Sequence, residues 1–307
     1  MALTLLLLLI VVALVFEFIN GFHDTANSIA TVVATKVLTP MQAVGLAASM
    51  NLIGALAAAA GNTDALIWAQ SAEPWYKGGG LFYKVVVPMV SSPIAGFLLG
   101  VMIMGLLFAL VALMARSGGW LARLARPRWV NAFFGKAQLV SAAYMGFAHG
   151  LNDAQKTMGI ISLALIGAQT TGTLDNLPDL LSFLHPDPAA DGGIDTWIKI
   201  TCALVMAAGT AAGGWRIIKT LGHKMVKLHP IHGFAAETAS ATILSTAATL
   251  GMPVSTTHSI STAIMGVGFA KRANALRWTV VERILWAWVF TIPVTAVLAY
   301  AMVWVTR

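Results

Sequence analysis

The chain has 307 residues, of which 58% are hydrophobic and only 10% carry a charge. An ordinary soluble domain carries roughly 25% charged residues, so this composition excludes a typical water-soluble protein. The net charge of +7 would suit a nucleic-acid partner, but the basic residues lie in short loops between apolar stretches, and this pattern indicates membrane orientation instead.

Long apolar stretches recur along the chain and predict membrane-spanning helices. A helix that crosses a bilayer needs about 20 predominantly apolar residues. Stretches close to this length cover residues 2–18, 41–60, 96–114, 196–214 and 284–305. The sequence therefore predicts an all-α, polytopic membrane protein.

The loops between these stretches indicate how the chain is oriented. Basic residues gather in 116–136, 216–227 and 271–283, and such loops are typical of the cytoplasmic side. The loop 170–195 contains five aspartates and neither Lys nor Arg, which predicts the opposite side. The chain then divides into a first repeat (1–114), a cytoplasmic basic linker (115–136) and a second, inverted repeat (137–307).

Two similar polar segments interrupt the apolar sequence, one in each half. They read Asn20-Gly21-Phe22-His23-Asp24 and His149-Gly150-Leu151-Asn152-Asp153, and aligning their glycines places Asp24 on Asp153. Glycine and short polar residues weaken helices, so we expect a helix break at each segment. The loops give the two segments opposite directions, which predicts an inverted-topology repeat with broken or re-entrant helices and a substrate site near the membrane midplane.

Ionisable residues inside the apolar stretches are candidates for function, because a charge at membrane depth is costly unless it is paired. The alternative is a structural buried pair, and it is the stronger interpretation for Glu17, which has no clear counterpart in the second half. Carboxylate and amide oxygens near helix breaks suit Na⁺ or a proton, and the sequence does not choose between them. The residues expected to serve this coupling cation are Asp24, Asn27, Asn152, Asp153 and Gln155.

A proline followed by hydroxyl residues marks a possible anion site in the second half. Pro253 sets a helix start, and Ser255, Thr256 and Thr257 then place hydroxyls beside free backbone N–H groups at the positive end of a helix. This arrangement favours an oxyanion such as phosphate, although the hydroxyls can instead bond back to helix carbonyls. Ser91-Ser92-Pro93 is a weaker candidate of the same kind in the first half, or a simple helix kink.

The remaining polar residues fit several kinds of site. Lys156 is placed either to neutralise phosphate or to pair with Asp153. No two of the chain's candidate histidines show the spacing of metal ligands on one helix, so we expect no resident metal site and no cofactor. An intramembrane enzyme with Ser255 as nucleophile and His258 as base is a further alternative, but a third orienting group is missing.

These segments resemble the duplicated signature of the inorganic phosphate transporter (PiT) family. The resemblance is carried by GFHDTAN at 21–27, GLNDAQK at 150–156, HPIHGFAAET at 229–238 and PVSTTH at 253–258, so it spans nearly the whole chain. It implies a bacterial low-affinity permease in the plasma membrane that carries phosphate by symport with H⁺ or Na⁺, or as a metal phosphate complex. Lipid would surround it, and the sequence leaves open whether it forms a homo-oligomer.

The resemblance also implies roles for individual residues. The aspartates and asparagines of the two segments would serve the coupling cation, and Ser255, Thr256 and Thr257 would hold phosphate. Glu237 would be an acid needed for transport, with His23, Lys156 and His258 associated with it. None of these roles is that of an enzyme.

The chain departs from the family pattern in its first half. Family members carry a Pro-Ser-Ser-Ser-His type loop there, but this chain has only the short stretch 61–84 without such a loop. A lost hairpin removes an even number of crossings, so the predicted orientations survive while half of the expected substrate site disappears. A pseudo-transporter that does not transport or needs a partner chain, and a sulfate transporter, are therefore the alternatives to phosphate symport.

Overall fold

The structure is a computed structural model that describes residues 2–58, 80, 82–175, 177–187, 194–221, 228–271 and 278–306. Every regular element in these ranges is a helix. Among them, four helices are long and apolar enough to cross a membrane: Ala2–Ala34, Phe82–Arg116, Thr196–Gly213 and Val281–Trp304. The predicted all-α, polytopic fold is confirmed.

Nine α-helices lie in the described ranges. They are α1 (Ala2–Ala34), α2 (Pro40–Leu56), α3 (Val87–Arg116), α4 (Gly119–Leu124), α5 (Pro127–Thr170), α6 (Thr196–Leu221), α7 (Pro230–Thr249), α8 (Thr256–Lys271) and α9 (Trp278–Thr306). A π-helical turn (Phe82–Val86) leads into α3, and a 3-10 turn (Asp179–Leu184) lies between α5 and α6. Helices α2, α5 and α7 each begin with a proline. Proline suits the first helical position because it lacks a backbone N–H, and an N–H at this position would have no partner within the helix.

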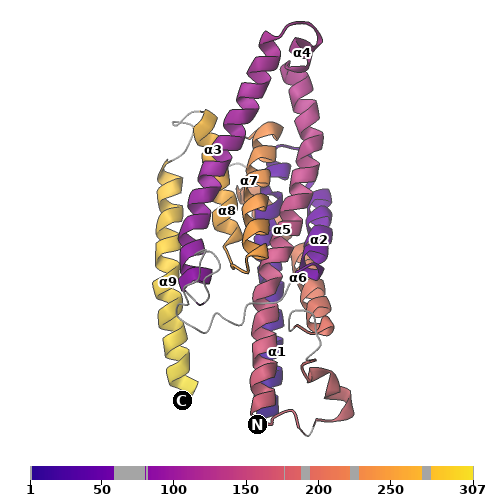
Figure 1. Cartoon of the computed structure of the whole chain (residues 1–307), viewed down its shortest axis with the longest axis vertical. Coiled ribbons are helices and arrows are strands. Elements are labelled where there is room, and N and C mark those ends of the chain that lie inside the picture. The colour runs from indigo at the N-terminus through magenta and orange to yellow at the C-terminus, as the bar shows by residue number, and fades with distance from the viewer. Residues whose placement is uncertain are drawn as a thin grey trace.

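Helices α1 and α5 lie side by side and antiparallel at the centre of the molecule (Figure 1). Their direction follows from polar contacts that step up one helix and down the other, which we call the polar ladder: Glu17 with Thr157, Asn20 with Asp153, Asp24 with His149, and Thr35 with Gln138. From Glu17 to Thr35 the ladder covers about 27 Å of helix, close to the roughly 30 Å of a bilayer core.

The two predicted helix breaks do not occur in these helices. Helix α1 runs without interruption through Asn20–Asp24, and α5 runs through His149–Asp153. The polar side chains of these segments find partners across the helix interface, so they do not need exposed backbone groups. The surplus length of α5 is accommodated differently: Figure 1 shows α3 and α5 extending together past the other helices to α4. The predicted linker 115–136 thus contains α4 and the start of α5.

The glycines of the two segments serve close packing of helices. A Cβ atom at Gly21 would overlap the carbonyl oxygen of Met206 in α6, and one at Gly150 would overlap the carbonyl oxygen of Asn51 in α2. Helix α1 therefore meets α6 in the same way that α5 meets α2. In an inverted repeat, α1 would correspond to α5 and α2 to α6, with the two members of each pair running in opposite directions. The antiparallel α1 and α5 and their matched packing on α6 and α2 fit this arrangement.

A substitution at Gly21 tests this packing. Gly21→Ala is expected to lower the free energy of unfolding by about 1–3 kcal/mol, because the added methyl group must push two helix backbones apart. Thermal unfolding in detergent micelles measures the effect. Gly105→Ala is the matched control, since a Cβ there would meet nothing within 4 Å. Equal stability of the two variants would contradict this account of the segment.

A re-entrant element does occur, in the second half of the chain. Helices α7 and α8 form a hairpin whose connection, residues 250–255, reaches only part of the way along α5 (Figure 1). The connection lies at the middle of the central helices, since Asn152 of α5 donates to the carbonyl oxygen of Met252 at 3.5 Å. Residues 229–271 lie between two basic loops, so either two full crossings or one hairpin would fit them, and the structure shows the hairpin. The hairpin delivers the start of α8 to the polar ladder.

The two chain ends lie at the same end of the molecule, and α4 lies at the opposite end (Figure 1). The basic loop 116–136, predicted on the cytoplasmic side, contains α4, so both chain ends lie at the end of the molecule away from that side. Helix α9 packs lightly on the rest: its apolar side chains are mostly exposed, and its contacts include Val281 with Met265. An apolar helix exposed in this way fits contact with lipid.

Candidate functional site

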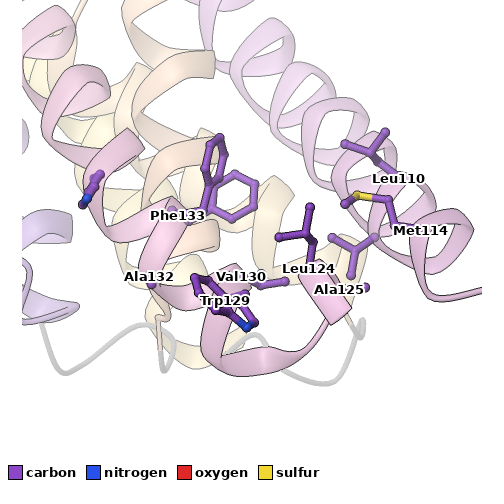
Figure 2. Close-up of a pocket in the computed structure, with 11 residues that line it drawn as sticks. Leu110, Met114, Leu124, Ala125, Trp129, Val130, Ala132 and Phe133 are labelled. Carbon is purple, nitrogen blue, oxygen red and sulfur yellow. The ribbon is translucent and has the colours of Figure 1, made fainter. Parts of the chain in front are cut away.

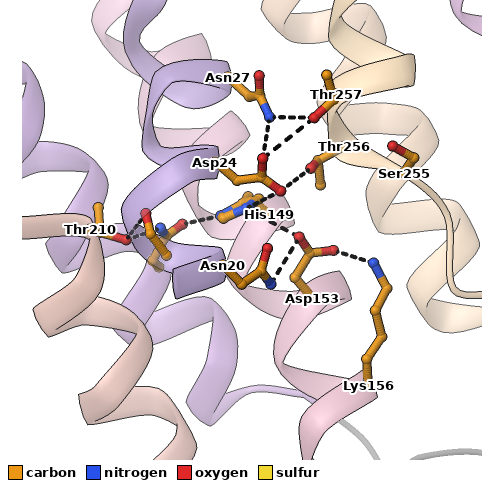
Figure 3. A network of polar contacts seen from close by, with 12 residues as sticks. Asn20, Asp24, Asn27, His149, Asp153, Lys156, Thr210, Ser255, Thr256 and Thr257 are labelled. Carbon is orange, nitrogen blue, oxygen red and sulfur yellow. Dashed lines mark hydrogen bonds and ion pairs between the residues drawn. The ribbon is translucent and has the colours of Figure 1, made fainter. Parts of the chain in front are cut away.

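Two aspartates from the two halves of the chain meet around one buried histidine (Figure 3). The Nε2 atom of His149 lies 3.2 Å from Oδ2 of Asp153 and 3.9 Å from Oδ2 of Asp24. The other ring nitrogen, Nδ1, lies 3.0 Å from Oδ1 of Asn51, which fixes the ring orientation. The predicted equivalence of Asp24 and Asp153 therefore has a spatial counterpart, because both carboxylates face the same imidazole.

The carboxylate of Asp24 also connects this cluster to the start of α8. Its Oδ1 atom accepts a hydrogen bond from Nδ2 of Asn27 at 2.9 Å and one from Oγ1 of Thr257 at 3.4 Å. Its Oδ2 atom accepts one from Oγ1 of Thr256 at 3.2 Å. Asn27 in turn donates to Oγ1 of Thr257 at 2.8 Å. The expected cation residues and the expected phosphate residues are thus direct neighbours.

Asp153 connects the cluster to the α7–α8 connection. The Nζ atom of Lys156 lies 2.7 Å from Oδ1 of Asp153 and donates to the carbonyl oxygen of Val254 at 3.1 Å. Lys156 therefore pairs with Asp153, and its side chain remains 32% exposed, so that it also reaches the cavity described below. Lys156 can therefore both pair with Asp153 and help to neutralise phosphate, the two alternatives that its sequence position left open.

The first turn of α8 presents hydroxyls and free backbone N–H groups. Ser255 precedes the helix, and its Oγ accepts a hydrogen bond from the backbone N–H of His258 at 3.4 Å. This is the role of an N-cap, which leaves other N–H groups of the first turn without helical partners. Figure 3 shows Thr256 and Thr257 of this turn, which is the positive end of α8, in contact with the carboxylate of Asp24.

A cavity of about 600 Å³ joins these groups. It lies between α1, α3, α5, α8 and α9, and its polar lining consists of Asn20, Asp24, Asp153, Lys156, Ser255, Thr256, His258 and Thr291. The ring of His258 lies against that of Trp288, with centroids 3.9 Å apart. The cavity is large enough for a small oxyanion and brings cation-type and anion-type ligands into one space.

Several predicted residues lie outside this cavity. Pro93 lines it, but Ser91 and Ser92 do not, and Ser91 is exposed on α3. His23 is exposed, with its ring against that of Phe22. Gln155 is half-buried and is not part of the cavity lining. The first half contributes Asn20 and Asp24 to the site and none of its serines.

Glu237 occupies a second polar centre, higher on the ladder. It lies in α7 and is completely buried. Its Oε1 accepts hydrogen bonds from Thr31 and, at 3.1 Å, from Gln138, while its Oε2 accepts one from Ser141. Helices α1, α5 and α7 are joined through this one carboxylate.

The sequence reasoning missed the partners that hold these groups in place. Asn20, Asn51, Gln138, Ser141 and Thr157 are buried or line the cavity, yet none was a candidate. The signal was available on α5, because 138, 141, 145, 149, 153 and 157 follow a helical period and include five polar residues. Asn51 carried no such signal, since the other polar residues of α2, Gln42 and Ser49, do not share its face of the helix and are exposed.

A second pocket, of about 470 Å³, lies where α3, α4 and α5 meet (Figure 2). Its lining is apolar apart from Lys136 and includes Leu110, Met114, Leu124, Trp129 and Phe133. This pocket lies near α4, at the far end of α5 from the ladder's aspartates. It lacks carboxylates and hydroxyls, so the ion chemistry belongs to the first cavity.

The fold and the first cavity define a class of protein. Long apolar helices, a re-entrant hairpin, and buried charges that line a cavity halfway along the helices are the features of a secondary transporter. A family model described as the phosphate transporter family matches residues 20–68 and 57–299. The chain belongs to this family and is a multi-pass protein of the plasma membrane.

Individual relatives cover the chain almost completely. It is 36% identical to the probable low-affinity inorganic phosphate transporter of Bacillus subtilis (strain 168), over 96% of this chain and 95% of the relative. It is 37% identical to the protein of the same description from Rhizobium meliloti (strain 1021), over 97% and 96%. A solved structure, the sodium-dependent phosphate transporter, matches with a TM-score of 0.70 over 94% of this chain and 96% of that chain; at 19% identity this establishes a shared fold.

The comparisons also bear on the shortened first half. The family model matches in two pieces that meet at residues 57–68, next to the stretch where the hairpin is expected to be lost. The alignment with the Bacillus subtilis relative extends over 348 positions, more than the length of this chain, so that relative carries residues without a counterpart here. The predicted loop at 61–84 lies largely outside the described residues.

Proposed function

We propose that the protein transports inorganic phosphate by symport with a cation, H⁺ or Na⁺. The observation that carries this proposal is the shared cavity, in which Thr256 of the α8 N-terminus lies 3.2 Å from the carboxylate of Asp24. The hydroxyls and N–H groups of α8 suit a phosphate oxyanion. Membership of the phosphate transporter family and the names of the relatives support phosphate as the substrate.

The charges of the cavity give a physical reason for coupling. Phosphate would bind beside Asp24 and Asp153, and like charges at such short range in a partly buried site repel each other. Lys156 and the α8 N-terminus offset part of this repulsion. A cation held by Asp24, Asn27, Asn152 and Asp153 would offset the rest, so phosphate and cation would favour each other's binding.

The loss of the first-half loop does not remove the hydroxyls of this cavity. Ser255 and Thr256 come from α8, and the first half contributes its polar groups from α1. A single hairpin together with α1 and α5 therefore supplies the ligands for both ions. This favours an active transporter over a pseudo-transporter that needs a partner chain.

Uptake of radiolabelled phosphate into proteoliposomes tests the proposal. The purified chain is reconstituted, and Na⁺ and H⁺ gradients are imposed separately, with protein-free liposomes as the control. Uptake that depends on one gradient, with less competition from sulfate than from unlabelled phosphate, is the expected result. Absence of uptake under both gradients, with insertion verified, would favour the pseudo-transporter, and stronger competition by sulfate would reassign the substrate.

A further inference from the structure

Glu17 is a buried acid that the phosphate and cation sites do not use. It lies in α1, its side chain is completely buried, and Oε2 accepts a hydrogen bond from Oγ1 of Thr157. The other oxygen, Oε1, is buried and has no hydrogen-bond partner among the described residues. The contact with Thr157 is the rung of the polar ladder next to the one between Asn20 and Asp153.

The other acids of the ladder are much better satisfied. Both oxygens of Glu237 accept hydrogen bonds from hydroxyl or amide donors. Asp153 has Lys156 and His149 as partners, and Asp24 has hydroxyl and amide donors from Asn27 and α8. Glu17 is therefore the acid with the fewest groups to stabilise a negative charge. A carboxyl group in this position is best accommodated in its neutral form, which carries a proton.

The surroundings of Glu17 support this contrast. The charged and titratable groups that face it are Asp153, His149 and Lys156 from α5 and the thiol of Cys202 from α6. Lys156 is engaged at 2.7 Å by Asp153, and no described cation forms an ion pair with Glu17. The rest of its environment is apolar and comes from α1, α5 and α6. An ionised Glu17 would thus face Asp153 without a counter-ion in contact.

We propose that Glu17 is a proton-binding site of the transport cycle. This inference rests on the proposed function. Glu17 lies on the side of the Asp24–His149–Asp153 cluster that is nearer the start of α1, which is the side predicted to face away from the cytoplasm. The carboxylate takes up a proton from that side, forms an O–H bond, and returns the proton to water when the site opens to the other side.

The position of Glu17 explains how a proton and phosphate would influence each other. Thr157 and Asp153 lie one helical turn apart on α5, so a charge on Glu17 acts directly on the wall of the cavity. Neutral Glu17 lowers the negative charge next to the phosphate site, and ionised Glu17 raises it. Phosphate would therefore bind preferentially to the protonated protein.

The variant Glu17→Gln tests the inference, because glutamine keeps the shape of the side chain and cannot exchange a proton. Reconstituted Glu17→Gln is expected to exchange internal for external phosphate but to lose accumulation driven by a pH gradient. Glu282→Gln is the matched control, since Glu282 is an exposed acid at the start of α9. We expect this control to behave as the wild type does.

The outcomes separate the inference from the function on which it rests. Wild-type accumulation driven by a pH gradient in Glu17→Gln would overturn the proton site and leave phosphate transport intact. Phosphate uptake by the wild-type protein that responds to a Na⁺ gradient and not to a pH gradient would also overturn the proton site and leave phosphate transport intact. A wild-type protein that neither accumulates nor exchanges phosphate would refute the proposed function, and the inference would fall with it.

A spectroscopic measurement tests the proton on Glu17 directly. The infrared spectrum of the purified wild type at neutral pH is expected to contain a carbonyl band from a protonated carboxyl group, and Glu17→Gln is expected to lack it. Thr157→Val removes the hydrogen-bond donor that Glu17 has among the described residues and should shift this band. Identical carbonyl spectra of wild type and Glu17→Gln would show that Glu17 is ionised and would overturn the inference.

Discussion

Asp153→Asn is expected to abolish gradient-driven phosphate uptake while leaving phosphate binding detectable. Asp153 holds one side of His149 and is the carboxylate of the cavity that pairs with Lys156. Asparagine has nearly the same shape but no charge, and it removes the repulsion that makes phosphate binding depend on a cation. Phosphate binding by the variant should therefore no longer respond to the coupling cation. Uptake into proteoliposomes and equilibrium binding measure the two effects.

The stability of this variant must be followed as well. Leaving one charge of a buried pair without its partner costs about 3–5 kcal/mol when both are buried. Lys156 keeps 32% of its side chain exposed, so a smaller loss is expected here. Asp179→Asn, in an exposed turn, is the control for a neutralised aspartate. Unchanged, gradient-dependent uptake in Asp153→Asn would remove Asp153 from the coupling mechanism.

The sequence alone was enough to predict that the polar segments of the two halves are equivalent, and Asp24 and Asp153 show why. Each follows a glycine by three residues in an apolar helix, and a charge in such a helix must face another helix or a cavity. That requirement brings the two aspartates together without any knowledge of the loops. A helix start close after Pro253 was also predictable, and α8 begins at Thr256, directly after its cap Ser255.

The continuity of α1 and α5 was not predictable from the same residues. Gly21 lowers the intrinsic stability of a helix, and this local effect favoured a break. In the structure the missing side chain lets α6 approach the backbone of α1, so tertiary packing outweighs the local preference. The residues around Gly21 do not indicate that Met206 of α6, more than 180 residues away in the sequence, will pack against it.

The same limit applies to the residues that satisfy the buried acids. Thr31, Gln138 and Ser141 surround Glu237, but they belong to two helices far apart in the sequence. Ser92 illustrates the opposite error: its type suggested a ligand, yet its hydroxyl is buried outside the cavity lining. Residue type alone does not show which way a side chain faces.

The charges of the site give a physical reason for the proposed coupling of two ions. The cavity contains two carboxylates, one lysine and one helix N-terminus, so it is balanced without phosphate and becomes too negative with it. A bound cation or proton restores the balance. Thr256 belongs to the proposed anion site and donates a hydrogen bond to the carboxylate of Asp24. A change of charge on this carboxylate would therefore alter the affinity of the anion site for phosphate.

The double variant Ser255→Ala/Thr256→Ala is expected to weaken phosphate binding by at least about tenfold, because a hydrogen bond to a charged group contributes roughly 1.5–3 kcal/mol. Thr256 lines the cavity, and Ser255 both lines it and caps α8. The lost cap costs about 1 kcal/mol of helix stability, which should appear as a small decrease in the unfolding temperature. Equilibrium binding of radiolabelled phosphate to the purified protein measures the affinity.

Thr256→Ser separates the hydroxyl from the rest of the side chain, since serine keeps the donor to Asp24 and to the cavity. It should bind phosphate as the wild type does, whereas Thr256→Ala should not. Thr242→Ala is the control for a hydroxyl that bonds only to its own helix, at 2.8 Å from the carbonyl oxygen of Thr238, on the exposed face of α7. Wild-type affinity in the double variant would mean that phosphate binds elsewhere in the protein, because a site built on the first turn of α8 cannot lose both hydroxyls without effect.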